Sequence, residues 1–404
     1  MEAMKILVVA PFLSGLDSGN GGGVVTFRQI AALASQHAVS FLSFSGVMAR
    51  DIEEKCTQAL AQVCEGVETV PLIIDRIRVA KAAFGSLSLS KPHLAALCWQ
   101  ASMQNALREH LARLKPDVVW IQFPQMAQYV TLCGDTPCIM DVQDAYTLSG
   151  FRHAQRVRGI GGVRAWLDWV CWARYEARHY AGFSAVLTLS EQDANVLSAM
   201  NPASVTLSMG LPLTEGVPPA SAPVPMRVGF AGAFGHRPNR EGLQWFLDQV
   251  WPRVLARVPH ASFVVAGRNP PPEFVARVGE GVSFSGFVPD IFTFYANNSV
   301  TVVPLVSGGG VKIKTVEAML AGSAVVATRI GAEGTGARHR QEVLVEDEPA
   351  AFADAIVSVL QDAGLRGRLA DAARSHAGSQ FATEAWRARI ADIFSRMVKS
   401  HGEH

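Results

Sequence analysis

The chain has little excess charge of either sign, no long apolar run and no closely paired cysteines. Its 36 Lys and Arg nearly balance its 35 Asp and Glu, so the formal net charge is +1 over 404 residues. Nucleic-acid-binding proteins normally carry a strong basic excess, so we expect no nucleic-acid partner. No stretch reaches 18 consecutive apolar residues, which argues against a membrane-spanning helix. Hydrophobic residues make up 49% and charged residues 18%, a globular composition.

The N-terminal stretch lacks the features of a secretory signal. No small-residue cleavage pattern follows "MEAMKILVVAPF", so this apolar run predicts a buried strand. The cysteines form no C-x-x-C pair and suggest neither a zinc site nor a disulfide framework. We therefore predict a reducing, cytoplasmic location, with peripheral contact at the inner membrane face as an open alternative. The cysteines are Cys56, Cys64, Cys98, Cys133, Cys138 and Cys171.

Short apolar segments alternate with longer helical patterns through the first half. They are mostly continuous in Val, Ile and Phe, which is typical of parallel strands covered on both faces. With helices between them, the natural architecture is a doubly wound α/β sheet. The expected strands are residues 5–12, 38–46, 67–73, 117–123, 138–144 and 185–190.

A segment with five prolines, "LPLTEGVPPASAPVPM" (211–226), then interrupts the pattern and predicts a linker. Beyond it the alternation restarts, so we expect two tandem Rossmann-like domains, 1–212 and 226–381, joined by a linker at 213–225. An amphipathic closing helix is expected at 382–404. Ligands of open α/β sheets bind at the carboxyl ends of strands, which predicts an interdomain cleft. The expected strands of the second domain are 227–234, 262–268, 282–288, 299–306, 323–329 and 342–347.

A glycine-rich junction is the strongest local signal of the second half. In "SGGGVKIKTVEAMLAG" (307–322) an expected strand leads through glycines into an expected helix. The first N–H groups of a helix have no intrahelical partner, the helix dipole adds positive charge, and glycines let an anion come close. The pattern therefore predicts a phosphate or diphosphate site. It matches neither G-x-x-x-x-G-K-[ST] nor the G-x-G-x-x-G dinucleotide fingerprint.

Two charged residues of this helix share one face. Lys314 and Glu317 are three residues apart, so they lie about one turn from each other. A lysine there can hold phosphate and the carboxylate can bind a ribose diol, which favours a nucleoside diphosphate site; an ordinary surface ion pair is the alternative. Lys312 can join them only if regular helix begins late.

A second glycine cluster opens a helix in the first half. "NGGGVVTFRQIAALA" (20–34) follows the first expected strand, so each domain presents a glycine-rich helix start at a strand's carboxyl end. Two such starts suit a diphosphate held from both sides. A flexible loop at residues 21–23 is the alternative.

Residues 308–334, "GGGVKIKTVEAMLAGSAVVATRIGAEG", resemble the donor-site signature of retaining GT-B glycosyltransferases of the family 4 type, the glycosyl transferases group 1. Residues 230–246, 264–270 and 282–290 are similar as well, so the resemblance covers nearly the whole second domain and is patchy in the first. It implies a GT-B fold and metal-independent transfer of a sugar from a nucleoside diphosphate sugar, with retention at the anomeric carbon. No cofactor is implied.

The resemblance also implies site residues. Glu317 falls where the family places the glutamate that binds the donor ribose. Relatives often clamp the diphosphate with an arginine and a lysine where this chain has Ala233 and Glu241, so Lys314 is expected to do so instead, with Lys312 second and Arg240 nearby. The other expected donor-side residues act through their backbone: Gly286, Phe287 and Val288 around the base, Gly309, Gly310 and Val311 at the diphosphate, and Gly22 and Gly23 from the first domain.

Two further positions depart from the family pattern. Many relatives carry another glutamate eight residues before the ribose-binding one, where this chain has Gly309. In the first domain a histidine often follows the strand that residues 138–144 match, and here Gln143 and Asp144 stand there. Asp144 is the candidate catalytic residue on this side. His153 is the alternative, although a lone histidine in a basic loop is more typical of solvated surface.

The acceptor side is expected in the first domain, for a glycan, lipid-linked or small-molecule acceptor. Residues 151–180 combine six arginines with Trp166, Trp169 and Trp172. Tryptophan and arginine on one helix can mark a membrane surface. A long core helix with a solvated basic face is the plainer alternative.

Two other functions remain open at this point. A nucleotide-sugar epimerase shares the two-domain scaffold but needs paired acid and base residues, and no paired carboxylates with a histidine are evident. A non-catalytic nucleotide-sugar-binding subunit is the other alternative, because the usual histidine and the earlier glutamate are missing.

Overall fold

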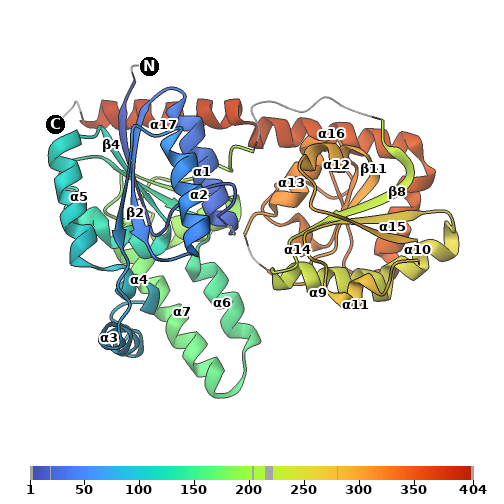
Figure 1. Ribbon diagram of the computed structural model, residues 1–404, viewed down its shortest axis with the longest axis horizontal. Coiled ribbons are helices and arrows are strands. Elements are labelled where there is room, and N and C mark those ends of the chain that lie inside the picture. The colour runs from blue at the N-terminus through green and yellow to red at the C-terminus, as the bar shows by residue number, and fades with distance from the viewer. Residues whose placement is uncertain are drawn as a thin grey trace. The chain divides into compact units, whose positions relative to one another are not determined.

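The computed structural model describes residues 3–18, 20–202, 204–213, 222–279, 281–308 and 310–401. The chain divides into two compact units, shown in Figure 1. Unit 1 consists of Met1–Pro212 with Trp386–His404, and unit 2 consists of Leu213–Ala385. Each unit contains one sheet of parallel strands with helices between the strands. The predicted pair of Rossmann-like α/β sheets is confirmed.

The sheet of unit 1 has seven strands in the order β3-β2-β1-β4-β5-β6-β7. Its strands are β1 (Lys5–Ala10), β2 (Ala38–Ser45), β3 (Gly66–Pro71), β4 (Val118–Gln122), β5 (Cys138–Val142), β6 (Ala185–Thr188) and β7 (Thr206–Ser208). Its helices are α1 (Gly21–Ala34), α2 (Arg50–Ala61), α3 (Arg76–Leu87), α4 (His93–Cys98), α5 (Ala101–Leu114), the 3-10 helix η1 (Pro124–Leu132), α6 (Tyr146–Arg156), α7 (Gly159–Tyr180), α8 (Glu191–Met200) and the C-terminal α17 (Thr383–His401).

The C-terminal helix α17 completes one face of the unit 1 sheet. Its apolar side chains are buried among those of β1, β2 and β4. Trp386 stacks on Trp120 with ring centroids 6.0 Å apart, and Phe394 meets Trp120 edge-on at 6.2 Å. Arg387 and Arg389 donate to the carbonyls of Ala32 and Met209 at 3.1 and 3.0 Å. The last helix of the chain is therefore part of the core of the first unit.

The sheet of unit 2 has six strands in the order β10-β9-β8-β11-β12-β13. Its strands are β8 (Val224–Ala231), β9 (Ser262–Ala266), β10 (Val282–Gly286), β11 (Asn298–Val303), β12 (Val325–Ala327) and β13 (Leu344–Val345). Its helices are α9 (Arg237–Trp245), the π-helical turn η2 (Phe246–Val250), α10 (Trp251–Arg257), α11 (Pro272–Val275), α12 (Ile291–Ala296), α13 (Ile313–Leu320), α14 (Arg329–Ala332), α15 (Pro349–Gln361) and α16 (Ala363–Phe381).

Both sheets reverse direction at one place, which fixes where each unit can bind a ligand. In unit 1 the chain moves outward from β1 to β3, returns to β4 and then moves the other way. In unit 2 the same reversal falls between β8 and β11. The loops that leave two such neighbouring strands run to opposite faces, which opens a crevice at their carboxyl ends.

The structure corrects several expected boundaries. The pattern at 151–180 is not one long helix, because α6 and α7 are separated at Val157 and Arg158 and α7 starts at Gly159, whose φ is +70°. Helices α9 and α10 are separated by the π-helical turn before Pro252, whose ring removes a backbone donor. Strand β8 begins at Val224, inside the expected linker, of which residues 214–221 lie outside the described residues.

None of the described helices is both long enough and apolar enough to cross a bilayer.

Candidate functional site

The carboxyl end of β8 receives a lysine from helix α13, across the switch point of unit 2. The Nζ of Lys314 donates to the carbonyl of Ala231 at 2.8 Å and to Oδ1 of Asn239 at 2.6 Å. It also lies 4.6 Å from the centroid of the Phe230 ring. Two of its three N–H donors are thereby used within the protein. The third is left for another acceptor.

Burial makes this lysine electrostatically unusual. It lowers the pKa of Lys314 from 10.5 to about 7, with a further lowering by Lys312 and an opposing effect of Glu317. A structural lysine is normally kept at the surface, where its charge is solvated. A lysine held at a strand end with a lowered pKa is instead typical of a functional site.

Helix α13 begins only at Ile313, so Lys312 lies in the turn before the helix. Lys312 is the residue before the first helical one, and its Nζ donates to the carbonyl of Gly310 at 2.6 Å. It also pairs with Glu333 at 3.4 Å, and its side chain is only 7% exposed. Lys312 therefore orders the glycine turn, while Lys314 lies at the end of β8.

Two residues at the start of α9 interact with the lysines and were not predicted from the sequence. His236 comes directly before α9, and its pKa is lowered by burial and then by the nearby charges of Lys314 and Lys312. Asn239 is buried, three residues further along the same face. Its amide donates to the carbonyl of Ala233 at 2.9 Å, which fixes the Oδ1 that accepts from Lys314.

Glu317 lies one turn beyond Lys314 on the same helix face, as predicted from their spacing. Its charge opposes the lowering of the Lys314 pKa and adds to the burial that raises the pKa of Tyr295 of α12. Glu317 is half-buried. A carboxylate in this place can accept hydrogen bonds from a pair of hydroxyl groups.

The glycine turn before α13 offers backbone donors. Gly310 has a φ of +71°, a conformation that glycine adopts without strain. Within the described residues, the N–H groups of Gly310 and Val311 have no hydrogen-bond acceptor. Gly309 lies outside the described residues. The turn thus combines unpaired N–H groups with the two lysines, an arrangement suited to an anion.

The other predicted donor-side residues of unit 2 make contacts of their own. Arg240 donates to the carbonyl of Phe234 at 3.0 Å and lines a surface depression with Gln244 and Phe274. Arg240 adjoins Asn239, which accepts from Lys314, and its role at the donor site stays a prediction. Gly286 ends β10, and Phe287 and Val288 follow it at the carboxyl edge of the same sheet. Phe287 is 57% exposed, with the Arg268 guanidinium 3.9 Å from its ring centroid.

The glycine cluster of unit 1 is the first turn of α1 rather than a flexible loop. Asn20 caps the helix by accepting from the N–H of Gly23 at 2.7 Å, so that donor is already used. Gly22 packs on the residue after β4, because a Cβ there would lie 2.7 Å from the Phe123 ring. Phe123 itself has a φ of +69°, a strained backbone at the switch point.

A buried polar network lies in unit 1 below this turn and was not predicted. Asp141 accepts from the indole N–H of Trp120 at 3.2 Å and from Gln143 at 3.3 Å, and Gln143 also donates to Gln122 at 3.0 Å. Burial raises the pKa of Asp141 to about 7, although hydrogen bonds from Gln29, Trp120 and Gln122 oppose this. The Oε1 of Gln143 is buried and has no partner among the described residues.

The predicted catalytic residue Asp144 directly follows this network. It is half-buried beyond the carboxyl end of β5, and its charge contributes to a raised pKa of Tyr146. His153 lies on α6 and lines a cavity with helices α3, α4 and α7, away from the strand ends.

Comparisons with known families cover most of the chain. Residues 225–362 match the family described as "Glycosyl transferases group 1", and residues 20–207 match the "Glycosyl transferase 4-like domain". The chain belongs to the group 1 glycosyltransferases. The match to the first domain includes the α1 turn, and the match to the second includes the lysine site.

Solved structures share the two-domain GT-B fold of this group 1 glycosyltransferase. Alr3699/HepE from Anabaena, crystallised in complex with UDP, is 14% identical, covering 97% of this chain and 100% of that chain with a TM-score of 0.65. Sucrose-phosphate synthase from Thermosynechococcus elongatus is 16% identical, covering 98% and 100% with a TM-score of 0.65. At these identities the likeness concerns the fold.

A curated relative is similar over a shorter stretch. An "Uncharacterized 44.6 kDa protein in cps region" of Klebsiella pneumoniae is 29% identical over 130 residues, which is 30% of this chain. The matched stretch spans about a third (33%) of that relative's length.

Proposed function

We propose that the chain transfers a sugar from a nucleoside diphosphate sugar to a hydroxyl group of a glycan, lipid-linked or small-molecule acceptor, with retention and without a metal ion. The observation that carries the proposal is the place of Lys314, an ammonium at the end of β8 and one turn from Glu317. The solved relatives support it, since Alr3699/HepE was crystallised with UDP and with UDP-glucose. The six free cysteines suit a reducing, cytoplasmic location.

The proposed reaction places most of the catalytic demand on the leaving group. The bond between the anomeric carbon and the diphosphate oxygen breaks, and the acceptor oxygen bonds to the same face of that carbon. The acceptor's proton passes to the departing phosphate oxygen. Lys314 and the N–H groups of Gly310 and Val311 stabilise the negative charge that develops there. Glu317 accepts from the ribose hydroxyls, and Asp144 is proposed to contact the transferred sugar.

Charge in this site comes from protein groups, which supports the metal-independent form of the proposal. Lys312 and Lys314 lie at one turn, and the N-terminus of α13 adds its partial positive charge. Together they can neutralise a diphosphate.

The proposal is tested by nucleotide binding followed by transfer. We expect UDP at about 100 times its Kd to stabilise the folded protein by about 2.7 kcal/mol, measured as a rise in melting temperature. Glu317→Ala should lose most of that rise, because the ribose contact is gone. Release of UDP from UDP-sugars with added acceptor should be the same with and without EDTA. If the chain binds nucleotide but releases no UDP from UDP-sugars in the presence of acceptors, it is a binding subunit instead.

The lowered pKa of Lys314 predicts a pH dependence of nucleotide binding. The ligand-free folded protein loses this proton near pH 7, whereas the unfolded chain keeps it to about 10.5, so the stability of the free protein rises between these values. A bound diphosphate favours the protonated lysine. Above pH 7 we therefore expect binding to take up a proton and to weaken as the pH rises, measured by calorimetry in buffers of different ionisation enthalpy. Proton uptake that persists in Lys314→Met would assign it to another group.

A further inference from the structure

Half of the exposed large apolar side chains lie in one small part of unit 1. Among the described residues sixteen such side chains are exposed, and eight of them fall within residues 73–94 and 163–166. Scattered exposed apolar residues are normal, but a contiguous group marks an interaction surface. The eight are Ile73, Ile74, Ile77, Val79, Phe84, Leu94, Val163 and Trp166.

The two segments are brought together by the fold. Helix α3 packs beside α7, and Ser86 of α3 donates to Asp168 of α7 at 3.5 Å. In Figure 1, helices α3, α4, α6 and α7 extend from one end of the unit 1 sheet. On α3, Ile77 and Phe84 are seven residues apart and share one face, with exposed fractions of 67% and 73%.

Basic residues outnumber acidic ones around these apolar residues, although Asp75 and Asp168 border the two segments. Residues 76–108 and 145–167 contain nine Lys and Arg and not one Asp or Glu. The whole chain has a net charge of only +1, so the basic residues are concentrated here. Arg76 and Lys81 lie on α3 beside the apolar face, and Arg158 and Arg164 lie at the start of α7, all four exposed.

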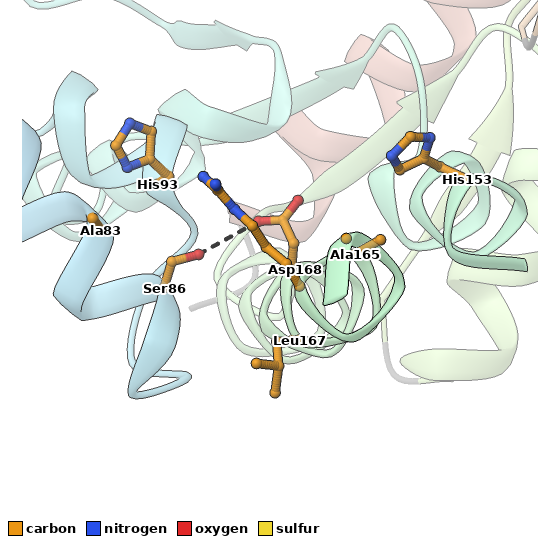
Figure 2. A pocket seen from close by; sticks show the side chains of 9 residues that line it. Ala83, Ser86, His93, His153, Ala165, Leu167 and Asp168 are labelled. Carbon is orange, nitrogen blue, oxygen red and sulfur yellow. Dashed lines mark hydrogen bonds between the residues drawn. The ribbon is translucent and has the colours of Figure 1, made fainter. Parts of the chain in front are cut away.

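A cavity opens between the same helices. It has a volume of about 480 Å³ and is lined by Ser86, His93, His153, Arg164 and Asp168. Figure 2 shows Ser86 and Asp168 facing each other across it, with His93 and His153 on either side. A second cavity of about 380 Å³ shares His93, His153 and Asp168. Polar and basic side chains thus lie beside exposed apolar ones.

We propose that α3 and the start of α7 form a docking surface for an anionic phospholipid bilayer, with Ile77, Phe84 and Trp166 inserted among the acyl chains. Apolar side chains flanked by lysine and arginine are the pattern by which helices lie in a membrane interface. The exposed guanidinium of Arg164 is proposed to contact a lipid phosphate. A second copy of this chain fits the surface less well, because two such faces would place basic residues against each other.

The test is co-sedimentation of the full chain with phosphatidylcholine vesicles, with and without phosphatidylglycerol, and without nucleotide. We expect binding to the anionic vesicles only, weakened by salt. The variant Ile77→Ser/Phe84→Ser and the variant Arg76→Gln/Lys81→Gln should each bind at least about tenfold more weakly, and Arg164→Gln should weaken binding too. Val278→Ser, which alters an apolar side chain of unit 2 that is also more than half exposed (56%), should bind as the wild type does.

Three results would overturn the proposal. They are failure of the wild type to bind anionic vesicles, equal binding to neutral vesicles, and a loss of binding in Val278→Ser as large as in the α3 variants. A change in the elution volume of Ile77→Ser/Phe84→Ser on gel filtration would instead assign the surface to self-association. Because no nucleotide is present, the outcome is separate from that of the proposed sugar transfer.

Discussion

Lys314→Met is expected to lower kcat by a factor of about 10²–10³, the effect of removing one preorganised group that stabilises developing negative charge. Lys314 lies within 2.8 Å of the Ala231 carbonyl, at the strand end where the leaving diphosphate is proposed to bind. The methionine side chain has similar length but no charge. The measurement is steady-state UDP release with saturating donor and acceptor.

The melting temperature distinguishes this loss of activity from unfolding of the variant. Burial disfavours the lysine charge, so replacing it with an apolar side chain should leave the melting temperature unchanged or raise it. Lys314→Arg should not restore activity, because the wider guanidinium cannot fit between Ala231 and Asn239. Lys55→Met, at an exposed position of α2, serves as the control and should keep full activity. Full activity in Lys314→Met would remove this lysine from the mechanism.

Trp386→Ala is expected to destabilise unit 1 by about 3–5 kcal/mol, the usual cost of truncating a fully buried aromatic side chain. Trp386 is 0% exposed and stacks on Trp120 of β4, so its loss leaves a cavity between α17 and the sheet. The measurement is the midpoint of chemical unfolding, followed by tryptophan fluorescence. Nucleotide binding by unit 2 provides a separate check on that unit.

Two matched variants test whether the destabilisation by Trp386→Ala comes from the loss of a buried aromatic ring. Trp386→Phe should lose much less stability, because it keeps an aromatic ring and removes an indole N–H that is buried and has no acceptor among the described residues. Phe84→Ala, at a side chain that is 73% exposed, should have little effect on the unfolding midpoint. If Trp386→Ala unfolds at the wild-type midpoint, α17 does not pack on unit 1 in solution.

Much of the fold could be predicted because its signals are local. Continuous apolar runs separated by helical patterns identify parallel strands, and all twelve predicted strands are present. The short strand β7 (Thr206–Ser208) was missed, since three half-buried residues carry no periodic signal. The amphipathic pattern of α17 was evident, but the sheet that receives it was not. That choice depends on side chains more than 250 residues away, such as Trp120.

The site residues that lie on one helix could be predicted from the sequence. Those that are brought together by the order of the strands could not. The spacing of Lys314 and Glu317 is enough to place them on one face. His236 and Asn239 meet Lys314 only because β8 and β11 are neighbours, and no local pattern reports strand order. The exposure of Phe84 on α3 was equally hidden, since an apolar residue in a helical pattern is normally expected in the core.

Helix α17 also sets the order in which the protein can be completed during synthesis. The core of unit 2 uses side chains between Val228 and Leu369, so it can close soon after those residues leave the ribosome. Unit 1 is synthesised first, yet one face of its sheet is covered only after Trp386 and Phe394 have been synthesised. At roughly 5–20 residues per second, that wait is on the order of ten seconds or more. Throughout it, the apolar face of β1, β2 and β4 remains open to chaperones and to neighbouring nascent chains.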